Sequence, residues 1–282
     1  MSCQWQAYIN LLPSWMRREV EEVGVDHLQE LRMRTGLYPE MILKNKAVSL
    51  SRIVTKDDLS FVINVASNFS PWTAETLQNG FITAPGGHRI GVCGYVAIHD
   101  SKIRSIPTVT SLCLRFARDF DGISGDTWKI KQSMLIIGPP GSGKTTFLRD
   151  LIRQKSNRCP GSISVIDERE EIFPLFKGQA CFSAGKHTDI FSGCGKAEGI
   201  NAVLRSMNPA WIAVDEITSS KDSKALLQAG WCGVQLIATA HAGSMEDFLT
   251  RPIYQPLVEH KLFSYVVILH RDKSWRLERI SE

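Results

Sequence analysis

The sequence of 282 residues lacks the features that mark several specialised classes of protein. Its seven cysteines include no C-x-x-C pair, which argues against a zinc site and a disulfide framework and favours reduced thiols in a cytosolic protein. No run approaches the ~18 apolar residues of a membrane span, and residues 1–25 lack the apolar segment of a secretory signal. Internal repeats and low-complexity stretches are also missing, so repeat architectures are not expected.

The chain also lacks a strong excess of charge of one sign. It has 33 Lys and Arg against 29 Asp and Glu, a net charge of +4 and a pI of about 8.7. This surplus is too small to indicate a nucleic-acid or anionic-membrane partner, and none is expected on this ground. With 43% hydrophobic and 22% charged residues, the composition is typical of a globular protein, and the length suggests about two domains.

Patterns in the first 118 residues predict a small α+β domain. Residues 14–23 place apolar side chains on one helical face. Thr55, with Asp58 three residues on, resembles a capping box that opens a second helix. Strands are expected at 27–35 and 111–116, with two more around the Gly86-Gly87 turn within 81–98.

The pattern changes after residue 118. Residues 119–130 contain DFDGISGD, whose Gly, Asp and Ser content indicates a linker. From 131 to 282, apolar runs alternate with helical stretches, which favours βαβ units and a mostly parallel sheet. Strands are expected at 133–137, 162–166, 211–214, 234–238 and 264–269. The fold class predicted is therefore α/β for this second domain.

Residues 138–145, GPPGSGKT, match the P-loop (Walker A) pattern G-x-x-x-x-G-K-[ST] at every fixed position. An apolar strand precedes the match and a helical stretch follows it, as a phosphate-binding loop requires. Lys144 would reach the β- and γ-phosphates of ATP, and the hydroxyl of Thr145 would ligate Mg²⁺. The predicted nucleotide-binding residues are Gly138, Pro139, Pro140, Gly141, Ser142, Gly143, Lys144, Thr145 and Thr146.

Carboxylates follow two of the predicted strands. Asp215 and Glu216 end the run WIAV, and the carboxyl ends of parallel strands share an edge with the P-loop. Asp215 would hold Mg²⁺, and Glu216 would polarise the attacking water. Glu168 follows the strand at 162–166 and competes with Glu216 as the catalytic base. The sequence does not separate the two.

A histidine follows a third strand, in the segment ATAHAG at 238–243. A lone histidine is more often a core or surface residue than a catalytic one. The position of His241 at a strand end favours a role in which it donates a hydrogen bond to the γ-phosphate and reports its loss.

The order of these motifs resembles the secretion ATPases of type II and type IV systems and the pilus-retraction motors. GPPGSGKTT, DERE, LRSMNP before WIAVDEI, and ATAHA stand in that order. DERE takes the place of the acidic box of that superfamily and ATAHA that of its histidine box. The resemblance implies a RecA-like P-loop domain and gives Arg205, in LRSMNP, a catalytic role.

The chain resembles most the stage III sporulation protein AA family of endospore-forming bacteria. The stretches that carry this resemblance are 30–40 (ELRMRTGLYPE), 79–94 (NGFITAPGGHRIGVCG), 111–119 (SLCLRFARD) and 196–209 (KAEGINAVLRSMNP). Residues 218–220 and Trp231-Cys232 depart from the family pattern. The resemblance implies a cytoplasmic homo-oligomer, a hexameric ring, that acts at the cytosolic face of a membrane channel complex between mother cell and forespore. It also implies that the N-terminal domain covers the nucleotide of its own or a neighbouring subunit.

Three functions follow from these observations. The leading hypothesis is an ATP-driven motor, in which a neighbouring subunit contributes an arginine in trans; the N-terminal candidates are Arg32, Arg34, Arg89 and Arg115. The alternatives are a nucleic-acid-stimulated P-loop ATPase, disfavoured by the balanced charge, and a nucleotide-gated assembly scaffold with slow turnover.

Overall fold

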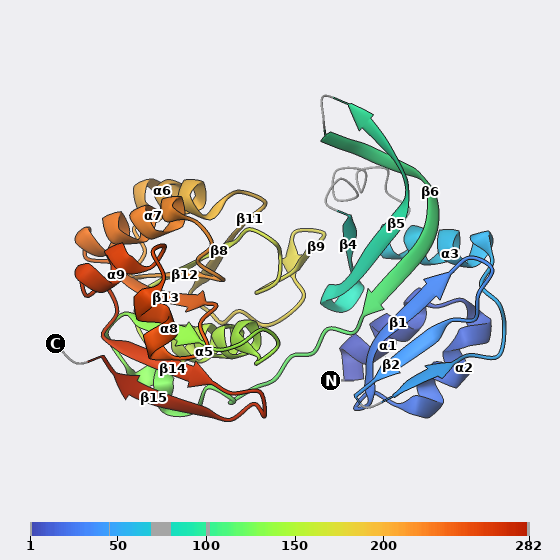
Figure 1. The fold of residues 1–282 in the computed structure, drawn as a ribbon, viewed down its shortest axis with the longest axis horizontal. Coiled ribbons are helices and arrows are strands. Elements are labelled where there is room, and N and C mark those ends of the chain that lie inside the picture. The colour runs from blue at the N-terminus through green and yellow to red at the C-terminus, as the bar shows by residue number, and fades with distance from the viewer. Residues whose placement is uncertain (1, 45, 69–79, 100–101, 281–282) are drawn as a thin grey trace. The chain divides into compact units, whose positions relative to one another are not determined.

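The computed structural model describes residues 2–44, 46–68, 80–99 and 102–280 (Figure 1). The chain divides into two units. The first comprises Met1–Asp119 with Pro174–Phe182, and the second comprises Phe120–Phe173 with Ser183–Glu282. Asn79, the first residue of the stretch 79–94 considered above, lies outside the described residues. Among those that are described, no helix has the length and apolar character needed to cross a membrane.

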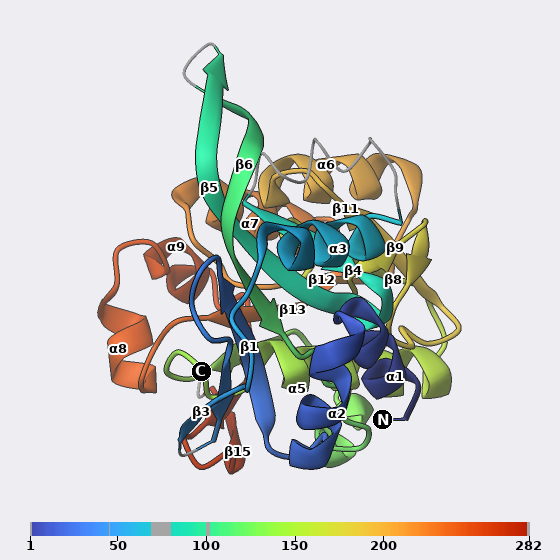
Figure 2. The ribbon, with the colours of Figure 1, turned by 90° about the vertical axis from the view of Figure 1, so that its right-hand side faces the viewer.

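The first unit is built on an antiparallel sheet with the strand order β3-β2-β1-β6-β5-β4. The strands are β1 (Leu28–Arg34), β2 (Glu40–Leu43), β3 (Ala47–Ser49), β4 (Phe81–Ala84), β5 (His88–His99) and β6 (Lys102–Arg115). The helices are α1 (Ser2–Leu11), α2 (Ser14–Val23) and α3 (Lys56–Ala66). Figure 2 shows β5 and β6 running on as a long two-stranded ribbon beyond the other strands of this sheet.

Alternating side chains explain how this unit forms its core. In β1, Leu31 and Met33 are buried, whereas Arg32 between them is exposed, the period-2 pattern of a strand with one covered face. The capping box that opens α3 is present: the Asp58 backbone N–H donates to Thr55 Oγ1 at 3.2 Å, and Asp58 Oδ2 accepts from the Thr55 N–H at 2.8 Å.

A hairpin from the middle of the chain completes the first unit. Its strands are β9 (Leu175–Phe176) and β10 (Gln179–Ala180), and it packs against the turn η2 (Pro85–Gly87). Phe182 is buried here, and a Cβ atom on Gly87 would lie only 3.0 Å from Phe182 Cζ. The sequence pattern placed all residues after 131 in the second domain, but burial of Phe182 associates 174–182 with the first unit.

The second unit is a mostly parallel sheet with the strand order β11-β8-β12-β13-β7-β14-β15. Its strands are β7 (Met134–Ile137), β8 (Ile163–Asp167), β11 (Thr188–Ser192), β12 (Trp211–Val214), β13 (Gln235–Ala240), β14 (Tyr265–Leu269) and β15 (Trp275–Arg279). Its helices are α5 (Lys144–Arg158), α6 (Lys196–Ser206), α7 (Ser220–Trp231), α8 (Met245–Thr250) and α9 (Gln255–Glu259). The five strands predicted in this domain are neighbours in the sheet and pair in parallel.

The segment interpreted as a linker, 119–130, is held along helix α5. The carboxylate of Asp150, fully buried, accepts hydrogen bonds from the backbone N–H groups of Gly122 and Ser124 at 2.9 and 2.8 Å. The ammonium group of Lys155 donates to the carbonyl oxygens of Trp128 and Ile130. These contacts make 120–130, including the turn η3 (Gly125–Lys129), an ordered part of the second unit.

Candidate nucleotide-binding site

The P-loop connects strand β7 to helix α5 in the second unit. Gly141 and Gly143 adopt φ angles of +74° and +101°, which a side chain would strain. A Cβ atom on Gly138 would lie 2.6 Å from Ser142 Oγ and 2.8 Å from the carbonyl oxygen of Leu269. The hydroxyl of Ser142 is buried and has no hydrogen-bond partner among the described residues. The loop therefore has the tight turns and the unused polar atom that fit a bound phosphate chain.

The side chain of Lys144 lies within this loop. Its ammonium group donates to the carbonyl oxygens of Gly138 and Pro139 at 2.8 and 3.2 Å, and it lies 3.1 Å from Nδ1 of His241. Burial lowers the pKa of Lys144, while the carboxylates of Asp215 and Glu216 act in the opposite direction. The ammonium group is thus already at the place where phosphate oxygens would replace the carbonyl oxygens as its acceptors.

A hydrogen-bond network links the P-loop to the ends of β12 and β13. The hydroxyl of Thr145 donates to Asp215 Oδ2 at 2.7 Å. The hydroxyl of Thr239, fully buried on β13, donates to Asp215 Oδ1 at 2.6 Å and accepts from the backbone N–H of Glu216 at 2.7 Å. Both carboxylate oxygens of Asp215 are therefore fixed beside the Thr145 hydroxyl.

The hydroxyl of Thr145 and the carboxylate of Asp215 fit Mg²⁺ as ligands. This ion commonly takes one or two protein oxygens and fills its remaining positions with phosphate and water. Within the described part of the chain, no cluster of three His, Cys, Asp or Glu side chains is placed to hold a metal ion alone. Thr145 and Asp215 are consistent with a metal that binds together with the nucleotide.

Glu216 and His241 form a pair next to Lys144. His241 Nε2 lies 2.9 Å from Glu216 Oε1, and both side chains are about one-third exposed (37% and 33%). Glu216 has a φ angle of +47°, an uncommon conformation for a residue with a side chain. With its Nδ1 facing the Lys144 ammonium group, a neutral His241 would donate from Nε2 to Glu216.

The carboxylates at the end of β8 have separate roles. Asp167 is buried and accepts three backbone N–H bonds, from Glu171, Ile172 and Phe173, at 2.8 to 3.0 Å. Burial raises the pKa of Asp167 to about 6, against the lowering effect of those three bonds. Asp167 therefore fixes the loop that follows β8. Glu168 instead forms an ion pair with the Lys196 ammonium group, at the start of α6.

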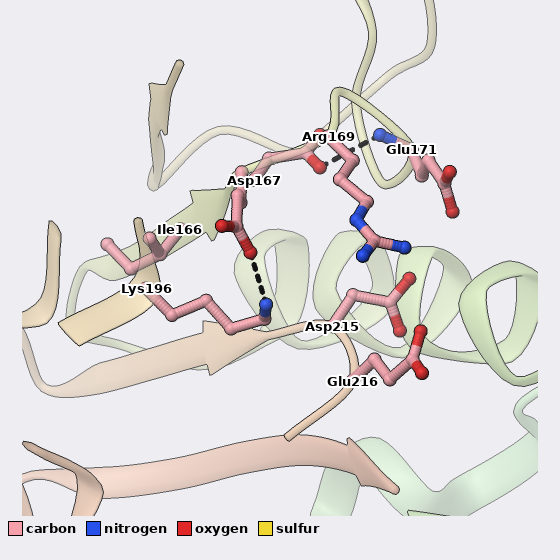
Figure 3. Close-up of a pocket in the computed structure, with 8 residues that line it drawn as sticks. Ile166, Asp167, Arg169, Glu171, Lys196, Asp215 and Glu216 are labelled. Carbon is pink, nitrogen blue, oxygen red and sulfur yellow. Dashed lines mark hydrogen bonds and ion pairs between the residues drawn. The ribbon is translucent and has the colours of Figure 1, made fainter. Parts of the chain in front are cut away.

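A pocket lies between the ends of β8 and β12 (Figure 3). Its lining consists of Ile166, Asp167, Glu168, Arg169, Glu171, Lys196, Asp215 and Glu216. Figure 3 shows the guanidinium group of Arg169 pointing toward the carboxyl groups of Asp215 and Glu216. The two candidate bases, Glu168 and Glu216, thus face the same pocket.

Most of the site residues predicted from the sequence lie at one edge of the sheet: the P-loop residues 138–146, Asp215, Glu216, His241 and Glu168. Arg205 does not join them within this chain. It is exposed in the last turn of α6, and the chain passes from there to the opposite end of β12. Its catalytic role stays a prediction.

Three residues of the site received no role from the sequence: Arg169, Lys196 and Thr239. Arg169 lies within DERE and Thr239 within ATAHA, so the motifs contained them, but only the fold reveals what their side chains face. One local feature of the sequence could have drawn attention to Lys196: a cation in the first turn of a helix is disfavoured by the helix dipole.

Comparisons with known proteins give the family and the fold of the chain. The family model described as "Sporulation stage III, protein AA" matches residues 4–280. The chain is 34% identical over 279 residues to stage III sporulation protein AA of Bacillus subtilis (strain 168), covering 93% of this chain and 90% of that protein.

Two solved structures share the fold. The Legionella pneumophila ATPase DotB matches with a TM-score of 0.63 and 14% identity, over 95% of this chain and 80% of that one. The pilus retraction motor PilT with bound ADP matches with a TM-score of 0.63 and 15% identity, over 94% and 82%. This likeness confirms the predicted fold class, a RecA-like α/β domain with a smaller α+β domain. With both the fold and the sequence matched along nearly its full length, the chain belongs to the sporulation stage III protein AA family.

Proposed function

We propose that this chain is a magnesium-dependent ATP hydrolase. The observation that carries the proposal is the bonded series Lys144, His241 and Glu216, which stands beside the Thr145–Asp215 pair at the P-loop. A lysine, two metal ligands and a carboxylate near one phosphate-binding loop are the parts that phosphoryl transfer to water requires.

The residues divide the reaction among them. The backbone N–H groups of the non-proline residues of the P-loop and the Lys144 ammonium group would bind the β- and γ-phosphates, and Thr145 and Asp215 would hold the metal. Mg²⁺, held by Thr145 and Asp215, would supply positive charge that stabilises the negative charge developing on the phosphate oxygens. Glu216 accepts the proton of the attacking water. His241 donates a hydrogen bond to the γ-phosphate and returns to Glu216 when that phosphate leaves.

The relatives of the chain support a proposal for its biological role. By family membership and by its likeness to DotB and PilT, the chain would use hydrolysis to drive assembly of, or transport through, a membrane channel complex during sporulation. It would act as a homo-oligomer, a ring of six copies in the cytoplasm, peripheral to the membrane through its partners. Arg205 and one N-terminal arginine would then contact the nucleotide of a neighbouring subunit.

Light scattering with Mg²⁺ and a non-hydrolysable ATP analogue tests the proposed ring. A monomer under those conditions contradicts it.

Phosphate release by the purified chain tests the hydrolase. The wild type is expected to hydrolyse ATP in the presence of Mg²⁺, and Glu216→Gln is expected to lose roughly 10²- to 10⁴-fold in kcat because it removes a general base. Lys144→Ala is expected to be inactive. Glu246→Gln, the same change at an exposed position on α8, serves as the matched control. Equal phosphate release by wild type, Glu216→Gln and Lys144→Ala would refute the proposal.

A further inference from the structure

Lys196 occupies a position that the local structure of helix α6 does not explain. It is the first residue of the helix, where the dipole disfavours a cation, and its cap residue, Gly195, has no side chain to satisfy the helix N-terminus. Lys196 is only 6% exposed, and burying an ammonium group is costly unless it is paired. Both the helix dipole and the burial of the ammonium group disfavour a lysine here, so Lys196 is expected to have a role outside the helix.

The partner of Lys196 is the carboxylate of Glu168. The two form an ion pair at the pocket that Asp215 and Glu216 also line. Glu168 is 38% exposed, so its carboxylate is open to the pocket on one side and held by Lys196 on the other.

Close packing of α6 against β8 makes this pair possible. A Cβ atom on Gly199 would lie 2.6 Å from Cγ2 of Ile166, so only a glycine allows the first turn of α6 to approach the strand this closely. Ile166 lies two residues before Glu168, and Gly199 lies three residues after Lys196. Because the first turn of α6 lies this close to β8, the side chain of Lys196 can reach the carboxylate of Glu168.

The two candidate bases have different partners. Glu216 is paired with a histidine that also contacts Lys144, whereas Glu168 is paired with a buried lysine. An ion pair with a buried lysine holds the Glu168 carboxylate in one orientation, whereas the partner of Glu216 is a half-buried histidine.

We infer that Lys196 is a positioning residue: it fixes the Glu168 carboxylate on the wall of the pocket, where Glu168 orients the attacking water that Glu216 deprotonates. This inference rests on the proposed ATP hydrolysis. It assigns the two carboxylates complementary roles, which the sequence alone left as alternatives.

A double-mutant cycle on the full chain tests this role through kcat and KM for ATP. Lys196→Met keeps the aliphatic stem and is expected to lower kcat by about 10- to 100-fold, the range typical of residues that orient a reacting group, with KM changed less than about threefold. Lys196→Arg, which keeps the charge, is expected to retain most of kcat. In a Glu168→Gln background, Lys196→Met is expected to cause no further loss, since Lys196 acts through Glu168.

Lys224→Met, at an exposed lysine on α7, is the matched control, and thermal unfolding of each variant reports whether the fold is kept. Losses that multiply in the double variant, or a Lys196→Arg variant as slow as Lys196→Met, would overturn the inference while leaving the hydrolase intact. A wild-type chain that releases no phosphate would overturn the proposed function and this inference together.

Discussion

At the scale of single residues, Thr239 connects Asp215 and Glu216 by hydrogen bonds. Its hydroxyl donates a hydrogen bond to one oxygen of Asp215 and accepts one from the backbone N–H of Glu216, so one buried side chain orients both the proposed metal ligand and the proposed base. Residues that orient metal ligands in this way typically affect metal affinity or activity by 10- to 100-fold.

Thr239→Val removes this hydroxyl with little change in volume. We expect a fall in ATP turnover of roughly 10- to 100-fold, together with a higher Mg²⁺ concentration for half-maximal rate, because Asp215 loses its orientation. Phosphate release across a series of Mg²⁺ concentrations measures both effects. Thr239→Ser retains the hydroxyl and should stay near wild type. A Thr239→Val variant with an unchanged Mg²⁺ dependence would show that this network is not needed.

Residues of the candidate site could be predicted from the sequence where a motif determines the local backbone structure. The P-loop pattern dictates loop and helix together, so Lys144 and Thr145 could be assigned before the structure was known. The choice between Glu168 and Glu216 depends on their partners, Lys196 and His241, which lie 28 and 25 positions away in the chain. Such partners are brought together by the sheet order, which local patterns do not encode.

At the scale of helices and strands, the predictions that succeeded rest on local rules. The capping box at Thr55 and the parallel strands of the second unit follow from residue types within a few positions. The hairpin β9–β10 does not. Its strands are two residues each, and it is placed in the first unit by Phe182 and the turn at Gly87, a contact between distant segments.

Gly87→Ala tests this contact. At φ +77° the alanine costs about 1–2 kcal/mol in the left-handed region, and its Cβ atom would also crowd Phe182. Gly36→Ala is the matched control, since Gly36 has φ +82° and no described atom within 4 Å of its Cβ position. We expect faster amide hydrogen exchange across residues 174–182 in Gly87→Ala and unchanged exchange there in Gly36→Ala. Equal exchange in both variants would mean that the hairpin is not held by this turn.

At the scale of the whole molecule, the chain passes between the two units three times, after residues 119, 173 and 182. The first of these passages leads into 120–130, which Asp150 and Lys155 tie to α5 rather than leaving as a free linker. The loop fixed by Asp167 leads directly into the segment 174–182 of the first unit. The chain itself thus connects the end of β8, where Glu168 lies, to the first unit.

The fold class could be predicted from the sequence because strands and helices alternate regularly from residue 131 and the P-loop identifies β7 as the first of these strands along the chain. The ring proposed above has only the family resemblance behind it, because contacts between copies of a chain leave no periodic pattern in its sequence.

Equilibrium binding of ATP tests the central claim most directly, that the loop before Lys144 holds a triphosphate. Calorimetric titration of a non-hydrolysable ATP analogue with Mg²⁺ into the full chain is predicted to give about one site per chain, weakened at least about 10-fold in Lys144→Ala by loss of a charge-assisted hydrogen bond. Folded wild-type protein that takes up no ATP, or a Lys144→Ala variant that binds ATP as tightly as the wild type, would contradict the account.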